Sequence, residues 1–75
     1  MPRLRPLSGD EFVRVMRALG YQIERTRGSH MMLRCHGRKP LTVPRHRELD
    51  RGTLRGLIRD AGLTVEEFMD LASER

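Results

Sequence analysis

The sequence predicts an α+β fold: a helix, a three-stranded antiparallel sheet, a second helix and a short C-terminal helix. Two capping-box motifs begin helical patterns near the two ends of the chain, and short alternating runs separated by glycines lie between them. With 75 residues, the chain is expected to form a single domain, residues 1–75, that begins with an arm at residues 1–7. A sheet this small buries one face against the helices and exposes the other.

The first helix is predicted over residues 9–19. Its capping box is Ser8-Gly9-Asp10-Glu11, in which the Ser8 hydroxyl accepts from the Glu11 amide and the Glu11 carboxylate accepts from the Ser8 amide. Gly20 suits the position that ends the helix. Apolar residues follow at helical spacing and form one face, namely Phe12, Val15, Met16 and Leu19.

Three strands are predicted next, over residues 21–27, 30–36 and 41–43. A tight turn at Gly28-Ser29 joins the first two, and Pro44 is expected to end the third. The short connections favour antiparallel pairing. In the second strand, alternation separates Met31, Leu33 and Cys35 on one face from His30, Met32, Arg34 and His36 on the other.

A loop at residues 44–50, which carries Arg45, His46 and Arg47, leads to the second helix. This helix is predicted from Asp50 or Thr53 to Ala61, with Gly62 closing it. Arg51, Arg55 and Arg59 recur at every fourth position and form one basic stripe, for which ion pairs with nearby acids are the alternative role. A second capping box at residues 64–67 predicts the last helix over residues 65–73. This order of elements is that of a double-stranded-RNA-binding domain.

The charge distribution favours a polyanionic partner. The net charge is +5, yet residues 60–75 are acidic, and 14 of the 15 basic side chains are arginines, which bind phosphate oxygens bidentately. The alternative is that arginine only keeps a small domain soluble. The single cysteine, Cys35, excludes an internal disulfide and fits a reducing compartment. Without a signal peptide or an apolar run of membrane-spanning length, a cytoplasmic location is expected.

Several motifs, in order and at similar spacing, resemble the HicA toxins of toxin–antitoxin systems. They are Arg27-Gly28-Ser29-His30, Leu41-Thr42-Val43-Pro44 with His46, Gly52-Thr53-Leu54-Arg55, and Asp60 to Thr64 leading to Glu67-Phe68. The resemblance implies a fold similar to double-stranded-RNA-binding domains, cleavage of mRNA that stops translation, and neutralisation by a HicB-type antitoxin. It places the family's catalytic histidine at His30 and its glycine turn at Gly28.

The chemistry of such a ribonuclease fits His30. RNA supplies its own 2′-OH as nucleophile, so the enzyme needs a proton-transfer group and donors for the charged phosphorane. Arg27, Arg34 and the amides of Gly28 and Ser29 are the candidate donors, and His46 is the candidate second acid/base. Because no residues have metal-ligand spacing, no metal or cofactor is expected. A non-catalytic module for structured RNA and a basic interaction protein for an acidic partner remain alternatives.

Overall fold

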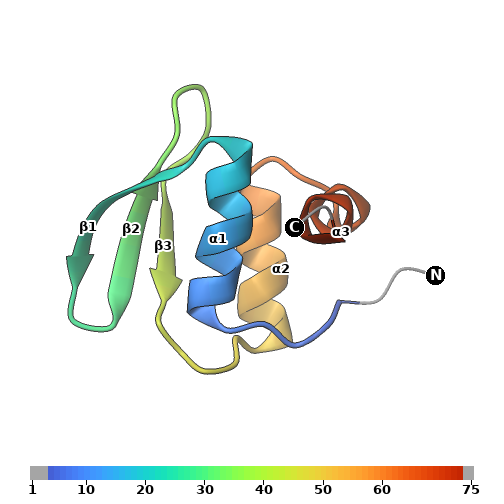
Figure 1. The fold of residues 1–75 in the computed structure, drawn as a ribbon, viewed down its shortest axis with the longest axis horizontal. Coiled ribbons are helices and arrows are strands. Elements are labelled where there is room, and N and C mark those ends of the chain that lie inside the picture. Colours follow the sequence, from blue (N-terminus) through green and yellow to red (C-terminus); the bar gives the residue numbers. More distant parts are fainter. Residues whose placement is uncertain (1–3, 74–75) are drawn as a thin grey trace.

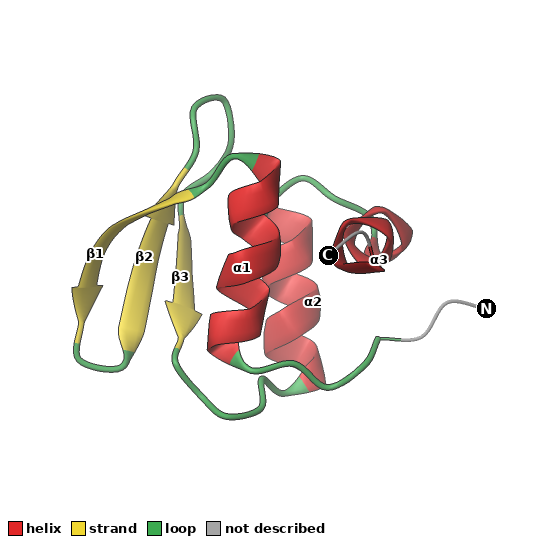
Figure 2. Ribbon diagram, in the orientation of Figure 1, coloured by secondary structure: helices red, strands yellow, loops and turns green. Residues whose placement is uncertain are grey.

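The computed structural model describes residues 4–73 and confirms the predicted order of elements (Figure 1). Part of the predicted arm, residues 1–3, lies outside the described residues. The elements are α1 (Gly9–Leu19), β1 (Gln22–Arg27), β2 (His30–Arg34), β3 (Leu41–Pro44), α2 (Arg51–Asp60) and α3 (Val65–Ser73). The helices α1 and α2 both pack against β3 of the sheet, and α3 packs against these two helices on the side away from the strands (Figures 1 and 2).

Both predicted capping boxes are present. The Ser8 amide donates to the Glu11 carboxylate over 2.8 Å, and the Glu11 amide donates to the Ser8 hydroxyl over 3.0 Å. Thr64 and Glu67 make the same two bonds at 2.8 Å and 3.0 Å. These motifs fix the first residues of α1 and α3 because each satisfies two backbone donors that the helix itself leaves unpaired.

The helix α2 begins after Asp50, which confirms the earlier of its two predicted starts. The Asp50 carboxylate accepts from the Thr53 amide over 2.8 Å, so helical residues begin at Arg51. At the other end Ala61 is the cap residue, and Gly62 follows with φ of +85°, a conformation that favours glycine.

The sheet has the strand order β1-β2-β3, with antiparallel pairing throughout. Arg27 lies opposite His30 and Ile23 opposite Leu33, with a β-bulge in β1 between Ile23 and Arg25. The bulge inserts Glu24, which shifts the alternation of β1 by one residue. The sequence prediction did not include it.

Three strand boundaries differ from the prediction, and the first is that β1 begins at Gln22 rather than at residue 21. β2 ends at Arg34, because the chain turns at Cys35, whose carbonyl accepts from the Arg38 amide over 3.1 Å. His36 therefore lies in an exposed turn, while Cys35 stays half-buried against the core. β3 extends through Pro44, which is tolerated because β3 is an edge strand and a proline there removes no ladder bond toward a neighbour.

The core lies between the inner face of the sheet and the helices. Phe12 of α1 and Phe68 of α3 stack with ring centroids 5.5 Å apart. Tyr21 is also buried, and its hydroxyl donates to the Lys39 carbonyl over 2.7 Å. The largest fully buried side chains also include Met16, Met31, Leu33, Leu54, Ile58 and Val43. None of the helices between residues 4 and 73 has the length and apolar character needed to cross a bilayer.

Candidate functional site

His30 is the first residue of β2 and lies on the open face of the sheet. The next residue, Met31, points into the core with 1% exposure, so alternation directs the exposed His30 side chain outward. A two-residue turn precedes it, in which Gly28 has φ of +59°, a left-handed conformation that favours glycine. The hairpin thus holds an accessible imidazole at one end of the sheet.

Arg27 is the predicted partner that the structure brings next to His30. The two residues pair directly across the hairpin, so both side chains leave the same face at adjacent positions. Arg34 shares this face but stands four residues further along β2, about 13 Å at the usual strand rise. Its Nε donates to the Glu24 carboxylate over 2.9 Å. The structure therefore does not bring Arg34 next to His30.

Ser29 links the hairpin turn to the loop after β3. Its carbonyl accepts from the Arg45 amide over 2.6 Å. The Arg45 side chain reaches Asp10 at the start of α1, with Nε 3.1 Å from Oδ1, and places another guanidinium nitrogen 3.5 Å from the Met31 sulfur. Arg45 therefore joins the turn, the core and α1, a role that the sequence analysis did not assign to it. Extending the β2–β3 register by one residue beyond Pro44 and His30 would have found its pairing with Ser29.

The loop between β3 and α2, whose sequence includes His46, lies at the same end of the molecule as the β1–β2 turn (Figure 1). The carbonyl of His46 accepts from the Gly9 amide over 2.9 Å. Its imidazole lies near the α2 cap: the Thr53 amide chiefly lowers the pKa of Asp50, and the charge of His46 acts in the same direction. Gly9 is required for this arrangement because a Cβ there would collide with the Pro44 carbonyl.

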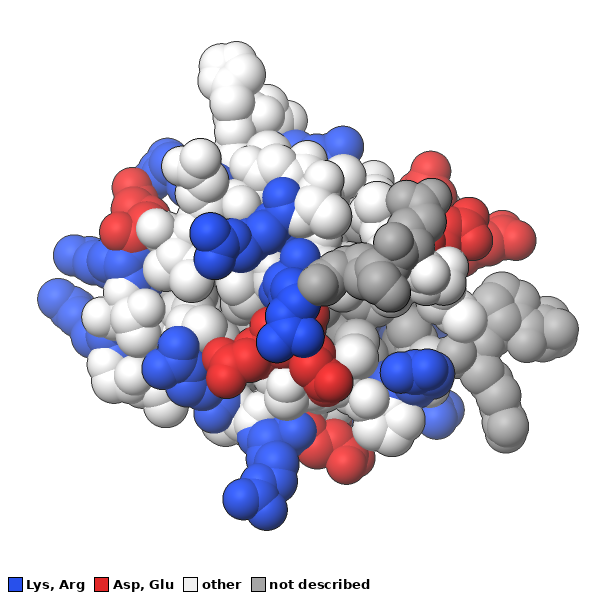
Figure 3. Space-filling view, in the orientation of Figure 1, with Lys and Arg blue, Asp and Glu red and all other residues white. Residues whose placement is uncertain are grey.

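The three arginines of the predicted basic stripe, Arg51, Arg55 and Arg59, are all exposed on α2. We call them the α2 stripe. Arg51 lies at the end of α2 that follows the His46 loop, whereas Arg59 is about 12 Å further along the helix axis. Among residues 4–73, the ion pair formed by the stripe is that of Arg59 with Asp60, at 3.7 Å. On the face shown in Figure 3, basic side chains spread over the sheet side and the hairpin end, and acidic ones lie at the outer edge of the sheet, near the lower end of α1 and at α3.

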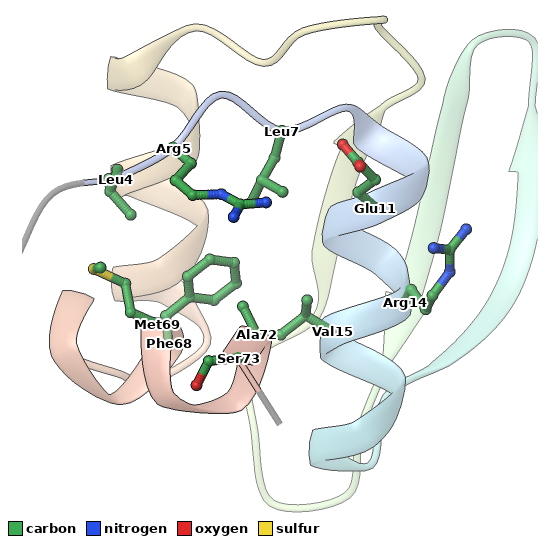
Figure 4. A pocket seen from close by; sticks show the side chains of 10 residues that line it. All are labelled: Leu4, Arg5, Leu7, Glu11, Arg14, Val15, Phe68, Met69, Ala72 and Ser73. Atoms are coloured by element: carbon green, nitrogen blue, oxygen red, sulfur yellow. The ribbon is translucent and has the colours of Figure 1, made fainter. Parts of the chain in front are cut away.

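A pocket lies away from these residues, between the N-terminal segment, α1 and α3 (Figure 4). Leu4, Leu7, Val15, Phe68 and Ala72 give it an apolar lining, with Arg5 and Arg14 also contributing. No strand residue lines it, so it is separate from the residues around His30 at the β1–β2 turn, Arg27 to His30, which we call the hairpin site. Within the described part of the chain, no three His, Cys, Asp or Glu side chains gather as a metal site would require.

Comparison with known proteins identifies the family. The family model for the HicA toxin of bacterial toxin–antitoxin systems matches residues 9–63. One similar solved structure is a toxin–antitoxin complex from Streptococcus pneumoniae, a chain of which is 36% identical with a TM-score of 0.69; the match covers 77% of this chain and 100% of that one. A comparison with curated proteins gave no match. The matched range runs from the start of α1 to the end of α2 and contains the whole hairpin site, and the chain therefore belongs to the HicA toxin family.

Proposed function

We propose that this toxin is a metal-independent endoribonuclease that cleaves mRNA and so stops translation, with His30 as general acid/base. The observation that carries the proposal is the position of His30: exposed, outside the core, at a hairpin end and directly paired with Arg27. A histidine with no packing role, next to a cation on a basic surface, suits proton transfer beside a phosphate.

The proposed reaction begins when His30 removes the proton from a ribose 2′-OH. The 2′ oxygen then bonds to the adjacent phosphorus, and the bond from phosphorus to the 5′ oxygen of the next nucleotide breaks. The products are a 2′,3′-cyclic phosphate and a 5′-OH, and the departing oxygen takes its proton from a second acid. His46 is our candidate for that acid because its loop and the hairpin turn are joined through Arg45 and Ser29.

Charge stabilisation is assigned to the residues around the turn. The phosphorane gains negative charge as the reaction proceeds, and Arg27 presents a guanidinium directly across from His30. The amides of Gly28 and Ser29 are the proposed additional donors. We assign phosphate binding outside the reacting nucleotide to the α2 stripe, with Arg34 as a further contact on the sheet.

We also propose that an acidic antitoxin of the HicB type covers the open face of the sheet. The similar solved structure is a toxin–antitoxin complex, and the open face here carries arginines around His30. Complementary charge speeds association, and a partner seated on this face blocks the imidazole directly.

The test of the activity is incubation of the purified chain with an unstructured RNA in EDTA. Cleavage with cyclic phosphate ends supports the proposal, and a DNA of the same sequence should remain intact because it lacks the 2′-OH. RNA retention without cleavage would instead favour a non-catalytic binding module. If the chain neither retains nor cleaves RNA, the remaining candidate is a basic protein that binds an acidic partner.

A further inference from the structure

The residues next to His30 on the open face form a second cross-strand row. The first row contains Arg27, His30 and Pro44. Two residues further along β2, Arg25 of β1 and Thr42 of β3 lie on either side of Met32. Strand geometry separates the two rows by about 6.6 Å. We call the triplet of Arg25, Met32 and Thr42 the second row.

The second row combines an apolar surface with polar groups at its edges. Met32 is the half-buried apolar side chain on the outer face of β2, where its neighbours His30 and Arg34 are polar and exposed. The Arg25 Nε donates to the Met32 sulfur over 3.4 Å, which holds the guanidinium against the thioether. Thr42, on the other side, is exposed and carries a hydroxyl that both donates and accepts.

The bulge in β1 is what directs Arg25 to this face. Tyr21 is buried and Ile23 pairs with the buried Leu33, so strict alternation would turn Arg25 and Arg27 toward the core as well. The extra residue at the bulge reverses the alternation and returns both arginines to the open face. The strand thus departs from regular geometry at the point where the second row begins.

We infer that the second row binds a nucleobase of single-stranded RNA, next to the nucleotide whose phosphate faces His30. This inference rests on the proposed ribonuclease function. Bases of single-stranded RNA stack on arginine guanidinium planes and other flat or polarisable groups, and their edges pair with polar side chains. A strand whose phosphate lies at Arg27 and His30 places the adjoining base over Met32 and Arg25, within reach of the Thr42 hydroxyl. The row is then a specificity-determining site beside the reacting one.

The test is a cycle that combines base removal with truncation of Met32. Short single-stranded RNAs, each with one abasic ribose, are titrated by fluorescence anisotropy against the His30→Ala chain, in which cleavage is blocked. We expect one abasic position, adjoining the cleaved bond mapped with the parent chain, to weaken binding about tenfold. In the His30→Ala, Met32→Ala chain the same base removal should cost about twofold or less, because the platform for that base is already gone. Arg25→Ala is the second variant and should show the same coupling.

The matched control is Met69→Ala, which truncates a half-buried methionine on α3 and should keep the full penalty for base removal. The Met32→Ala change should also leave the salt dependence of binding unaltered because methionine is uncharged. The inference would be overturned if base removal weakened binding equally with and without the Met32 and Arg25 side chains. It would also be overturned if the chain did not bind RNA. In either case the second row would be a surface for a protein partner. Coupling without cleavage by the parent would refute the ribonuclease proposal alone, whereas cleavage without coupling would refute the second row alone.

Discussion

The substitution His30→Ala is expected to abolish RNA cleavage and leave the fold intact. His30 is exposed on the face opposite the core, so its truncation opens no cavity, and such surface changes usually stay within about 0.5 kcal/mol. For a domain of this size that corresponds to a change in Tm of at most about 2–4 °C. Loss of a general acid/base removes about 10²–10⁴ in rate, which makes a slow enzyme undetectable.

The assay compares the parent and the His30→Ala chain by thermal melting, RNA affinity and cleavage of one labelled RNA. RNA affinity should change little because many arginines contribute to it. His36→Ala is the matched control: it removes an exposed histidine from the turn beyond the other end of β2 and should leave cleavage unchanged. Full activity of the His30→Ala chain would refute the mechanism and transfer the role to His46, and a large fall in its Tm would show that His30 is structural.

Four further predictions concern binding, inhibition and stability. Replacing all three arginines of the α2 stripe by alanine should flatten the slope of log affinity against log salt by about 0.7–0.9 per lost phosphate contact, and an unchanged slope would leave the stripe as solvated surface. In the antitoxin complex, His30 should be protected from diethyl pyrocarbonate, so undiminished reactivity there would rule out direct occlusion. Phe68→Ala should cost about 3–5 kcal/mol, close to the whole stability of a small domain, and a chemical melt that matches the parent would contradict the role of α3 in the core. Backbone amides lower the pKa values of Glu11 and Asp50, so the stability that these two caps contribute is complete above the unfolded-state pKa values and is lost as the pH falls below about 4. A chain with Glu11→Gln and Asp50→Asn should therefore lose less Tm on acidification than the parent. Parallel curves of Tm against pH for the two chains would contradict this.

Local motifs made most of the fold predictable from the sequence. Each of these motifs involves about four consecutive residues, so its geometry can be predicted from the local sequence alone. They are the capping boxes at Ser8 and Thr64 and the glycine turn at Gly28. The same locality placed His30 beside Arg27, since a hairpin turn fixes that pair. The site roles assigned to these residues remain predictions.

Features that depend on distant contacts were missed. Arg45 acquires its position from a bond to Ser29 and an ion pair with Asp10, which meet only after β3 docks and α1 packs. The end of β2 was placed too late because alternation continues through His36 while the backbone already turns at Cys35. The bulge did leave a signal in the sequence, because the inward residues change from Tyr21 and Ile23 to Thr26. A prediction based on strict alternation of side chains does not interpret such a break as a bulge.

The bulge at Glu24 also divides β1 into two halves that differ in which side chains face the core and which face solvent. Before the bulge, Ile23 lies on the same face of the sheet as its buried partner Leu33, although Ile23 itself is 39% exposed in this edge strand. After the bulge, Arg25 and Arg27 lie on the open face. Substitutions of Arg25 or Arg27 can change the exposed surface without touching the hydrophobic interior. A deletion of one residue at this point is different in kind, because it restores a regular strand and forces one of the two halves to face the wrong way. We therefore expect an insertion or deletion at Glu24 to destabilise the sheet more than a replacement of Arg25 or Arg27 does.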